Sequence, residues 1–562
     1  MSETEDSPKT ARVAAIDDEL LEVTARERIM RALGLTMLLV VATIAGYQQI
    51  WRAGFVWQDD MSVSANPLLT VVGGLRAVWL HPFAGLSPVA FTFVSLEHAL
   101  WGTNAVGYHW FSIGLHLVNV LILWRVLRNL ELPGAWLAAA MFALHPVEVE
   151  SVAWVTQQRD LLMGFWSLLA LLAWLTFVAG KHRGELKFYF VCLICFLLAL
   201  GCDPIACLLP FVFLLISWLK RGAISFSRVV QVIPFALLGG IVAGLTWWQA
   251  RYQLGEGARF ATPILERVVL AARDFWFYLA KLLWPTAYPF HYTRWNIAET
   301  SAFDYIWVGG LVLLVALILL ARRWCRRGPE TALVFFALLL APTLVFVVLG
   351  TLRYSFLADH YPYLASIGPL ALVAAGVTSA LESRQRLKAV LLPLIGMVIL
   401  AALGFRAWQQ ARTYASSEAL LNEIAAHYPL RWLAHYDVAN WLLIRRDVDA
   451  ALARYQEAID SYPRNLALRK ELADRLVRLG RSGEAVEQYR AVLALDPNSA
   501  VANYQLALAL LFDGKLDEAR QHAEKGVAAD PNDTAAQTNY GIILSQLGER
   551  DAAVTHFQKA LE

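Results

Sequence analysis

Two adjacent carboxylates, Asp59 and Asp60, follow the first long apolar segment of the sequence in the run GFVWQDDMS. Aromatic and apolar neighbours place this pair near a membrane surface. A partly buried carboxylate there accepts a proton from a hydroxyl nucleophile, or binds a divalent cation such as Mg²⁺ or Mn²⁺. A solvated pair, or a pair that caps a helix, would have the same sequence. The motif therefore leaves a catalytic and a structural interpretation open, and a divalent cation is the one cofactor that it suggests.

Further ionisable side chains lie at the ends of later apolar segments, on the side opposite to the basic loops. Such groups are costly at the ends of spanning helices unless they face water, a cavity or one another. Their clustering on one side predicts a single pocket, although loops outside a membrane are also polar without any catalytic role. The residues are His145, Glu148, Glu150, Arg159, Asp160, Asp203, Arg353, Asp359, His360 and Tyr361.

The composition shows what kind of scaffold carries these residues. Of the 562 residues, 58% are hydrophobic and only 17% are charged, and the mean hydropathy is +0.48. A soluble protein carries about a quarter charged residues, so the chain is predicted to be a membrane protein. The net charge of +2 gives no electrostatic reason to expect a nucleic-acid partner.

Up to about residue 410, apolar windows recur that are long enough to cross a hydrocarbon core of about 30 Å. Together they predict an all-α, polytopic membrane domain of about eleven spanning helices. The windows are 31–49, 108–127, 134–152, 161–179, 187–203, 205–219, 229–249, 304–321, 331–351, 361–381 and 389–407.

Lys and Arg cluster on one side of these windows if the N-terminus is cytoplasmic, since short basic loops stay in the cytoplasm. This alternation requires residues 265–284 to be non-spanning. Arg267, Asp274 and Lys281 recur there at intervals of seven and form one polar stripe on a helix. We expect this helix to lie in the membrane interface or to dip back, with the stripe toward water or a cavity. Eleven crossings then place the C-terminus outside.

The C-terminal part is a repeat array. Four prolines are spaced by 34 residues, which is the period of tetratricopeptide repeats: Pro429, Pro463, Pro497 and Pro531. The small residues Ala439, Ala473, Ala507 and Gly541 keep the same period. The pattern predicts a leading helix at 412–428 and repeats at 432–465, 466–499, 500–533 and 534–562. Such a solenoid binds a peptide or a protein partner, or serves as a rigid spacer.

Several blocks resemble, in their order, the GT-C membrane glycosyltransferases with C-terminal tetratricopeptide repeats, which include O-mannosyltransferases and bacterial relatives. The blocks are FVWQDD…NP, ALWGTNAVGYHWFSIGLHLVNVLIL, HPVEVESVAWVTQQRDLL, YLAKLLWP and ADHYPYLASIG. With the repeats, the resemblance covers nearly the whole chain. It divides the chain into a cytoplasmic segment 1–30, a GT-C-like domain 31–410 and a repeat domain 411–562.

The resemblance implies an inverting transfer of a sugar from a polyprenyl-phosphate donor to a protein or glycan acceptor on the outer face. Asp59 is then the expected base for the acceptor hydroxyl, and Asp60 positions it or a metal. Arg159, Arg353, His360 and Tyr361 are expected at the donor phosphate, because a leaving phosphate needs a neutralising cation. The rest of the pocket is expected to comprise His145, Glu148, Glu150, Asp160 and Asp203.

The sequence departs from the family pattern at three basic positions. It has Ser87-Pro88-Val89 for Arg-Pro-Leu, Cys202-Asp203-Pro204 for Ser-Lys-Pro, and Asp359-His360-Tyr361 for acid-Arg-Tyr. Either the donor is bound differently, with a metal held by Asp203 and the histidines, or activity is lost. His360 would be a cation if Asp359 raised its pKa.

Two functions of different class follow from these observations. The first is a glycosyltransferase of a bacterial inner membrane, with periplasmic repeats that hold the acceptor or a partner near the site. The second is a nonenzymatic membrane scaffold that displays a periplasmic platform for protein interactions. The substitution Asp59→Asn separates the two, because only an enzyme would lose its activity.

Overall fold

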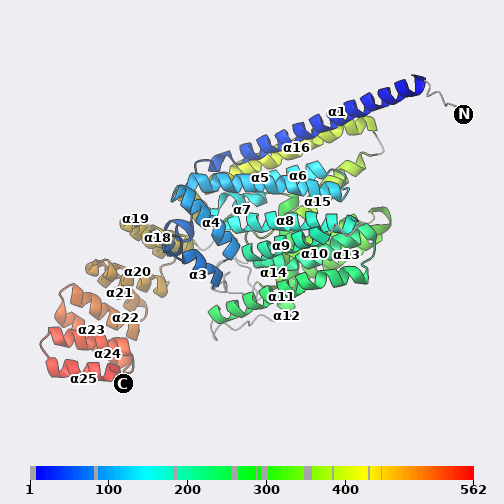
Figure 1. Cartoon of the computed structure of the whole chain (residues 1–562). Coiled ribbons are helices and arrows are strands. Elements are labelled where there is room, and N and C mark those ends of the chain that lie inside the picture. The colour runs from blue at the N-terminus through cyan, green and yellow to red at the C-terminus, as the bar shows by residue number, and fades with distance from the viewer. Residues whose placement is uncertain are drawn as a thin grey trace. The chain divides into compact units, whose positions relative to one another are not determined.

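The computed structural model describes most of the chain and contains only helices and connecting segments there (Figure 1). Two compact units emerge, Met1–Ile424 and Ala425–Glu562; the domain boundaries expected from the sequence stay a prediction. The described residues are 8–57, 59–80, 87–180, 186–254, 264–286, 288–290, 292, 302–325, 327–346, 357–382, 385–427, 431–444 and 446–561.

Seven helical stretches of the described residues are long and apolar enough to cross a membrane, so the first unit is that of a multi-pass membrane protein. They are Ile29–Gly46 in α1 (Pro8–Gly46), Ala105–Asn129 (α5), Val155–Ala179 (η4, Val155–Gln157, and α8, Gln158–Ala179), Pro204–Arg221 (η6, Pro204–Leu208, and α10, Leu209–Arg221), Phe226–Gln249 in α11 (Phe226–Leu254), Phe303–Arg323 in η7 (Ala302–Tyr305) and α13 (Ile306–Cys325), and Ala389–Tyr414 in α16 (Gln385–Ala411) and η9 (Arg412–Tyr414).

The other four expected windows contain shorter apolar helices, so eleven crossings are not confirmed. These helices are α6 (Ala135–Leu144), α9 (Leu186–Cys202), the apolar part of α14 (Gly328–Phe346), and α15 (Ile367–Ala380). The shortening of α6 has a local cause. His145 precedes Pro146 and adopts an extended conformation, so the helix stops at Leu144. Ten residues of helix reach about 15 Å, half of a hydrocarbon core.

One bent pair of helical segments was not expected from the windows. Ser62–Thr70 and Gly74–Leu80 meet at 90°, and together they are long and apolar enough for a broken span or a re-entrant loop. The break lies at Gly73, whose φ of 89° suits glycine. A window that averages hydropathy along a straight helix does not detect such a pair.

The helix expected to be non-spanning is α12 (Ile264–Leu283), and it is not among the candidate spans. It packs against α13, α14 and α15. Asp274, at the centre of its polar stripe, is only 1% exposed. The stripe therefore faces protein at its centre rather than water, and its C-terminal end lies beside the candidate site described below.

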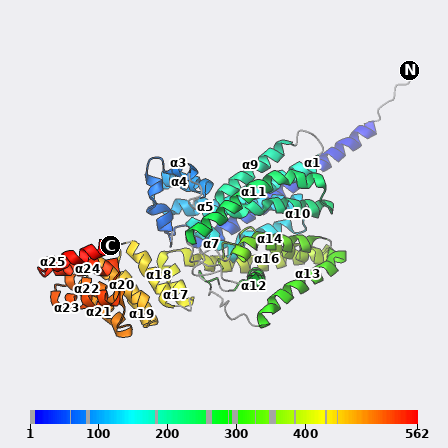
Figure 2. The same ribbon diagram turned by 90° about the horizontal axis from the view of Figure 1, so that it is seen from below.

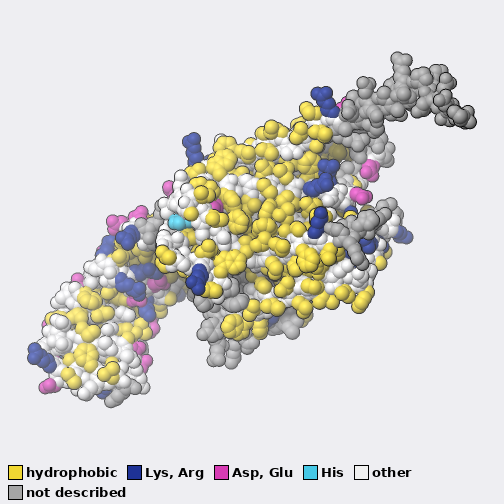
Figure 3. All heavy atoms as spheres, viewed as in Figure 1, with side chains coloured by type: hydrophobic (Ala, Val, Ile, Leu, Met, Phe, Trp, Pro, Cys, Tyr) yellow, Lys and Arg dark blue, Asp and Glu magenta, His cyan; other side chains and the backbone are white. Residues whose placement is uncertain are grey.

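The core of the membrane unit forms where α8 packs against α5 and α9, and where α6 packs against α5, α15 and α16. In Figure 1, α1 runs alongside α16, and these two helices are in contact. Hydrophobic side chains cover most of the visible face of this unit (Figure 3). Large apolar side chains such as Ile241, Val312 and Val398 are more than half exposed, as expected for helices in contact with lipid.

The second unit consists of four antiparallel helix pairs that stack in chain order (Figure 2). Pro463, Pro497 and Pro531 each fall between two pairs, whereas Pro429 lies outside the described residues. The pairs are α18 (Arg431–Ile444) with α19 (Val448–Ser461), α20 (Leu466–Arg478) with α21 (Ser482–Leu495), α22 (Ala500–Phe512) with α23 (Leu516–Ala529), and α24 (Thr534–Gln546) with α25 (Arg550–Leu561).

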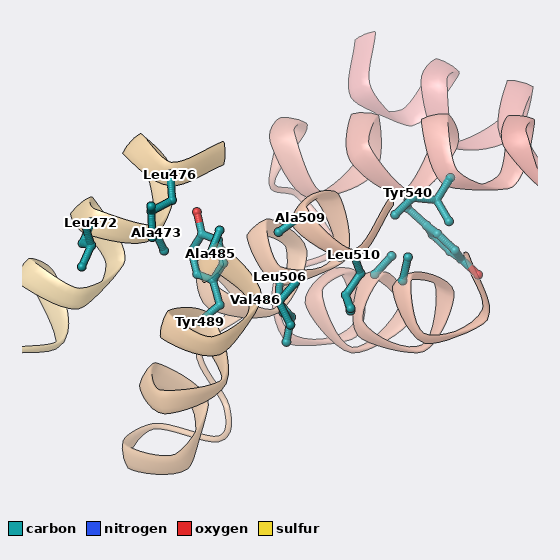
Figure 4. Packing of buried hydrophobic residues seen from close by; sticks show 14 of the residues in the cluster. Leu472, Ala473, Leu476, Ala485, Val486, Tyr489, Leu506, Ala509, Leu510 and Tyr540 are labelled. Atoms are coloured by element: carbon teal, nitrogen blue, oxygen red, sulfur yellow. The ribbon is translucent and has the colours of Figure 1, made fainter. Parts of the chain in front are cut away.

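The periodic small residues lie where the two helices of a pair meet. Ala439, Ala473 and Ala507 are fully buried in the core of the solenoid. Figure 4 shows Ala473 among the side chains of this core. At the equivalent position of the last pair, a Cβ on Gly541 would lie 2.7 Å from the ring of Phe557, which explains the glycine there. Tyr489 fills the large position of its pair and donates its hydroxyl to Asp474.

Candidate functional site

Asp59 is fully buried and tied to the start of α8. Its Oδ2 accepts a hydrogen bond from the backbone N–H of Val56 at 3.1 Å. Its Oδ1 accepts from the backbone N–H of Thr156 at 2.7 Å and lies 2.6 Å from the Thr156 hydroxyl oxygen. Asp59 therefore joins the segment after the first span to η4, three residues before Arg159. The side chain of Asp60 lies outside the described residues.

Arg159, in the first turn of α8, lies between two buried carboxylates. Its Nε is 3.8 Å from Oδ1 of Asp160 and 3.8 Å from Oδ2 of Asp203. Nε also donates to Oε1 of Gln157 at 3.2 Å. The side chain is 43% exposed, and among the described residues its terminal guanidinium nitrogens make no hydrogen bond. Those nitrogens are available to bind an anion while Nε stays anchored by Gln157.

Asp203 is held in place by the start of the next helix. It is the N-cap of η6, and its Oδ1 accepts from the backbone N–H of Ile205 at 2.9 Å. Pro204 follows at the first helical position, where its missing N–H costs nothing. The Asp203-Pro204 pair is thus a helix start whose second carboxylate oxygen faces Arg159.

A second group of polar residues surrounds Glu150, in α7 (Val149–Ala153). Its Oε1 lies 2.9 Å from Nδ1 of His360, and its Oε2 accepts from the backbone N–H of Asp359 at 2.8 Å. The carboxylate of Asp359 in turn accepts from the hydroxyl of Tyr292 at 2.6 Å. All these side chains are buried. His360 also interacts electrostatically with Arg159, Asp160 and Asp203, which places the two groups side by side.

His145 and Glu148 connect helices beside this network. Nδ1 of His145 accepts from the backbone N–H of Val147 at 3.2 Å, so Nε2 carries the proton and donates to the carbonyl of Leu282 at 3.1 Å. Both ring nitrogens are therefore used within the fold. Oε1 of Glu148 accepts from the hydroxyl of Ser366 at 2.7 Å, while its Oε2 has no partner in the described part of the chain.

Burial sets the protonation of the Glu150 group. Burial raises the pKa of Glu150 to about 8, and it raises the pKa of Asp359 well above its ordinary value, with Glu150 adding repulsion. The pKa of His360 is lowered to about 4, chiefly by burial. The expectation that Asp359 turns His360 into a cation was therefore wrong. The Asp359 carboxylate is bonded to Tyr292, and His360 is bonded to Glu150 and stays neutral at neutral pH.

Of the other residues expected at the donor phosphate, the structure describes Tyr361 but not Arg353. Arg353 lies outside the described residues. The ring of Tyr361 packs edge-on against that of His360 with centroids 4.5 Å apart, and Tyr361 interacts electrostatically with Arg159. The structure thus brings Arg159, His360 and Tyr361 together.

The sequence did not single out four residues that contact this site. Thr156 holds Asp59, Tyr292 holds Asp359, and the indole of Trp154 lies edge-on to His360 with ring centroids 6.1 Å apart. Lys281, which was noted only as part of a polar stripe, has its Nζ 5.1 Å from the ring centroid of Tyr292. Thr156 and Trp154 stand inside a family-like block, so the block itself was the available signal. Tyr292 has no such signal.

A metal has no evident set of ligands here. Within the described ranges, no group of three or more His, Cys, Asp or Glu side chains is arranged to hold a metal ion. Asp203 is committed to a helix cap and to Arg159, and His145 uses both ring nitrogens. No step proposed below passes through a metal.

The raised carboxyl pKa values predict that stability falls as the pH rises from about 5 to about 8. Glu150 and Glu97, which lies in α4 (Pro88–Trp101), both have a pKa of about 8 because of burial. Each binds its proton more tightly in the folded state than in the unfolded state, so its contribution is full at low pH and is lost as the pH rises through about 8. The apparent Tm in detergent should decrease between about pH 5 and 8 and level off above that range, and E150Q and E97Q should each reduce that decrease. A Tm that rises over this range would contradict the assignment.

Comparison with known proteins identifies the repeats directly. The model of the tetratricopeptide repeat family matches residues 442–500, 470–534 and 504–562. The C-terminal unit is a tetratricopeptide array. Of solved structures, a MamA protein from Desulfovibrio magneticus RS-1 is 24% identical, with coverage of 26% of this chain and 82% of that chain and a TM-score of 0.24.

Part of the chain is similar in sequence to protein O-mannosyl-transferases. A Caenorhabditis elegans protein of that name is 31% identical over 153 residues, which cover 24% of this chain and 22% of the relative. A Drosophila melanogaster protein of that name is 29% identical over 154 residues, which cover 25% of this chain and 18% of the relative. The chain thus spans about a fifth of the length of the curated relatives it matches.

Proposed function

We propose that this chain is a membrane glycosyltransferase of the GT-C type. It transfers a sugar from a polyprenyl-phosphate donor to a hydroxyl group of a protein or glycan, with inversion at the anomeric carbon. The observation that carries the proposal is the arrangement around the start of α8. A buried carboxylate, Asp59, is hydrogen-bonded to Thr156, which lies three residues before the half-exposed guanidinium of Arg159.

In the proposed reaction the acceptor oxygen attacks the anomeric carbon, and the bond from that carbon to the phosphate oxygen breaks with its electron pair. The proton of the acceptor hydroxyl passes to Asp59, and Asp60 positions this hydroxyl. The hydrogen bonds from Val56 and Thr156 fix the orientation of Asp59 before the substrate arrives. The phosphate leaves with increased negative charge, and Arg159 neutralises that charge with its terminal nitrogens, assisted by Arg353 and Tyr361.

The remaining polar residues shape the pocket in this proposal. Asp160 and Asp203 hold Arg159 between them, and Glu150 holds His360. His145 and Glu148 fix the ends of the surrounding helices. The pocket opens to the periplasmic side of a bacterial inner membrane, with the N-terminus in the cytoplasm. The repeats lie in the periplasm and hold the acceptor or a partner, which raises the local acceptor concentration.

The names of the relatives make mannose the first sugar to test. Envelope proteins from cells with and without this chain should be compared by mass spectrometry. The proposal predicts O-linked hexose on a set of envelope proteins or glycans that is missing when the chain is missing. An unchanged glycan inventory in both strains would argue for the alternative, a scaffold in which the polar network only stabilises the fold.

A further inference from the structure

His360 is held by one ring nitrogen and presents the other. Its Nδ1 lies 2.9 Å from Oε1 of Glu150, and among the described residues Nε2 has no hydrogen-bond partner. The other oxygen of Glu150 accepts from the backbone N–H of Asp359 at 2.8 Å, which fixes the carboxyl plane. The imidazole therefore has one orientation, set by Glu150, in which Nε2 is available to a ligand.

A second nitrogen beside this ring also lacks a partner. Trp154 is 6% exposed, and its Nε1 has no hydrogen-bond partner in the part of the chain that the structure describes. The indole packs edge-on to His360, with ring centroids 6.1 Å apart. An indole N–H only donates, and a buried donor without an acceptor is unusual in a native fold. A ligand that supplies an acceptor oxygen would satisfy it.

Arg159 supplies further donors within electrostatic range of His360. It interacts electrostatically with His360, and its terminal nitrogens make no hydrogen bond among the described residues. Its charge is balanced by Asp160 and Asp203, both near its Nε. Three donor side chains, one of them a cation, suit a group with several anionic oxygens. A phosphate has that chemistry.

We propose that Glu150 is a positioning residue that directs Nε2–H of His360 at the donor phosphate, in an anion site shared with Arg159 and Trp154. This inference rests on the proposed function for the identity of the phosphate as part of a lipid. In this site a neutral imidazole stands where the acid-Arg-Tyr pattern has a guanidinium, and Glu150 selects the tautomer of that imidazole.

The tautomer depends on the proton of Glu150. With a pKa of about 8 for Glu150 and about 4 for His360, the carboxyl group donates its proton to Nδ1 between these values, and the ring proton is on Nε2. Above about pH 8 the carboxylate instead accepts from Nδ1–H, and Nε2 presents a lone pair that repels an anion. Asp359 and Tyr361 on the same segment, and Asp160 and Asp203 opposite, also face this ring. Arg159 keeps its charge throughout.

The test is a binding experiment on the full chain in lipid nanodiscs. The probe is undecaprenyl phosphate, whose charge is constant from about pH 7 to 9.5 because the second pKa of a phosphate monoester is about 6. Wild-type affinity should fall about tenfold through pH 8, as for the loss of one hydrogen bond to a charged group. Methyl phosphate, which lacks the lipid chain, should bind more weakly and lose affinity over the same range. Affinity that is constant or rises through pH 8 overturns the proposal.

The variant E150Q separates the tautomer effect from other titrations. The Gln amide oxygen can accept from the N–H of Asp359 while its NH₂ donates to Nδ1, which keeps the proton on Nε2 at every pH. The alkaline decrease in affinity should therefore disappear in E150Q. Glu97 also has a pKa of about 8 and donates nothing to His360, so E97Q is the matched control and should retain the decrease. A decrease that persists in E150Q, or vanishes in E97Q, refutes the role of Glu150.

A second variant guards against misfolding of E150Q. H360R restores the guanidinium of the acid-Arg-Tyr pattern, and it should bind undecaprenyl phosphate with no decrease through pH 8, provided that it elutes as a single species in size-exclusion chromatography. If H360R shows the wild-type decrease, His360 is not the titrating donor. The probe carries no sugar, so this result is independent of catalysis. If the chain transfers sugar but its affinity for undecaprenyl phosphate does not fall through pH 8, only the anion site is refuted. If the affinity falls but no sugar is transferred, only the enzymatic function is refuted.

Discussion

Replacement of Asp59 by asparagine should lower the rate of sugar transfer about 1,000-fold, within the range that a positioned general base contributes. Asparagine has nearly the same shape but cannot accept the hydroxyl proton. Its oxygen can still accept from the N–H of Thr156, so the link between the first span and η4 is kept in part. Initial rates with a labelled polyprenyl-phosphate sugar, measured in nanodiscs, give the decrease directly.

The structural role of Asp59 needs a matched control. In D59N the NH₂ of the new amide would face the N–H of Val56, where the carboxylate now accepts a hydrogen bond, and this costs about 1–3 kcal/mol of stability. T156V removes only the hydroxyl beside Oδ1 and keeps the carboxylate and the backbone hydrogen bond. It should lower the apparent Tm yet retain at least about a tenth of the transfer rate. Equal losses of activity in T156V and D59N would show that Asp59 acts only through the fold and is not the base.

Replacement of Arg159 by lysine should reduce kcat/KM for the lipid donor about 100-fold, the lower end of the effect of removing one donor that stabilises developing charge. Lysine preserves the positive charge between Asp160 and Asp203, so the fold should tolerate it. Lysine lacks the planar guanidinium, in which Nε is held by the protein while the two terminal nitrogens bind the phosphate. Steady-state kinetics against donor concentration should show a raised KM together with a reduced kcat.

An arginine outside the site serves as the comparison for R159K. Arg475 in α20 pairs with Glu471 at 3.0 Å and is partly exposed, as Arg159 is. R475K makes the same chemical change within the solenoid. Because a surface ion pair contributes little, this variant should keep the kinetic constants for the donor within about twofold of wild type. If R159K is as active as R475K, the guanidinium does not bind the phosphate.

The helical fold and the repeats could be predicted because they follow from periodic patterns. A 34-residue period fixes each Ala at a helix contact, as the burial of Ala473 and Ala507 shows. Apolar windows located the helices of the membrane unit, but not their lengths. The end of α6 depends on His145 and Pro146, and the bent pair depends on a positive φ at Gly73. A hydropathy average is insensitive to both.

The sequence predicted which residues of the candidate site lie together, but not which of them are hydrogen-bonded to each other. Topology placed Arg159, Asp203 and His360 on one side of the membrane, and the structure brings them together. The partner of His360 was not predictable from proximity along the chain. Asp359 is adjacent in sequence, yet its carboxylate bonds to Tyr292, and Glu150 from another helix takes the imidazole instead. Which carboxylate meets which base is decided by tertiary packing between segments about 210 residues apart.

The role of Asp59 shows the same limit. Its position after the first span predicted a carboxylate near the membrane surface, but not the two backbone N–H groups that bind it. Backbone groups carry no sequence signature, so a motif of two acidic residues cannot distinguish a solvated pair from one that is buried and oriented. The structure shows the buried, oriented arrangement for Asp59.

The most direct measurement is transfer by the purified chain itself. Full-length protein in nanodiscs should be supplied with polyprenyl-phosphate mannose labelled in the sugar, and with envelope protein from cells that lack this chain. The account predicts that label moves into the protein or glycan fraction while free polyprenyl phosphate appears in equal molar amount. If the donor stays intact, or if D59N transfers as much label as wild type, the chain is not the glycosyltransferase proposed here.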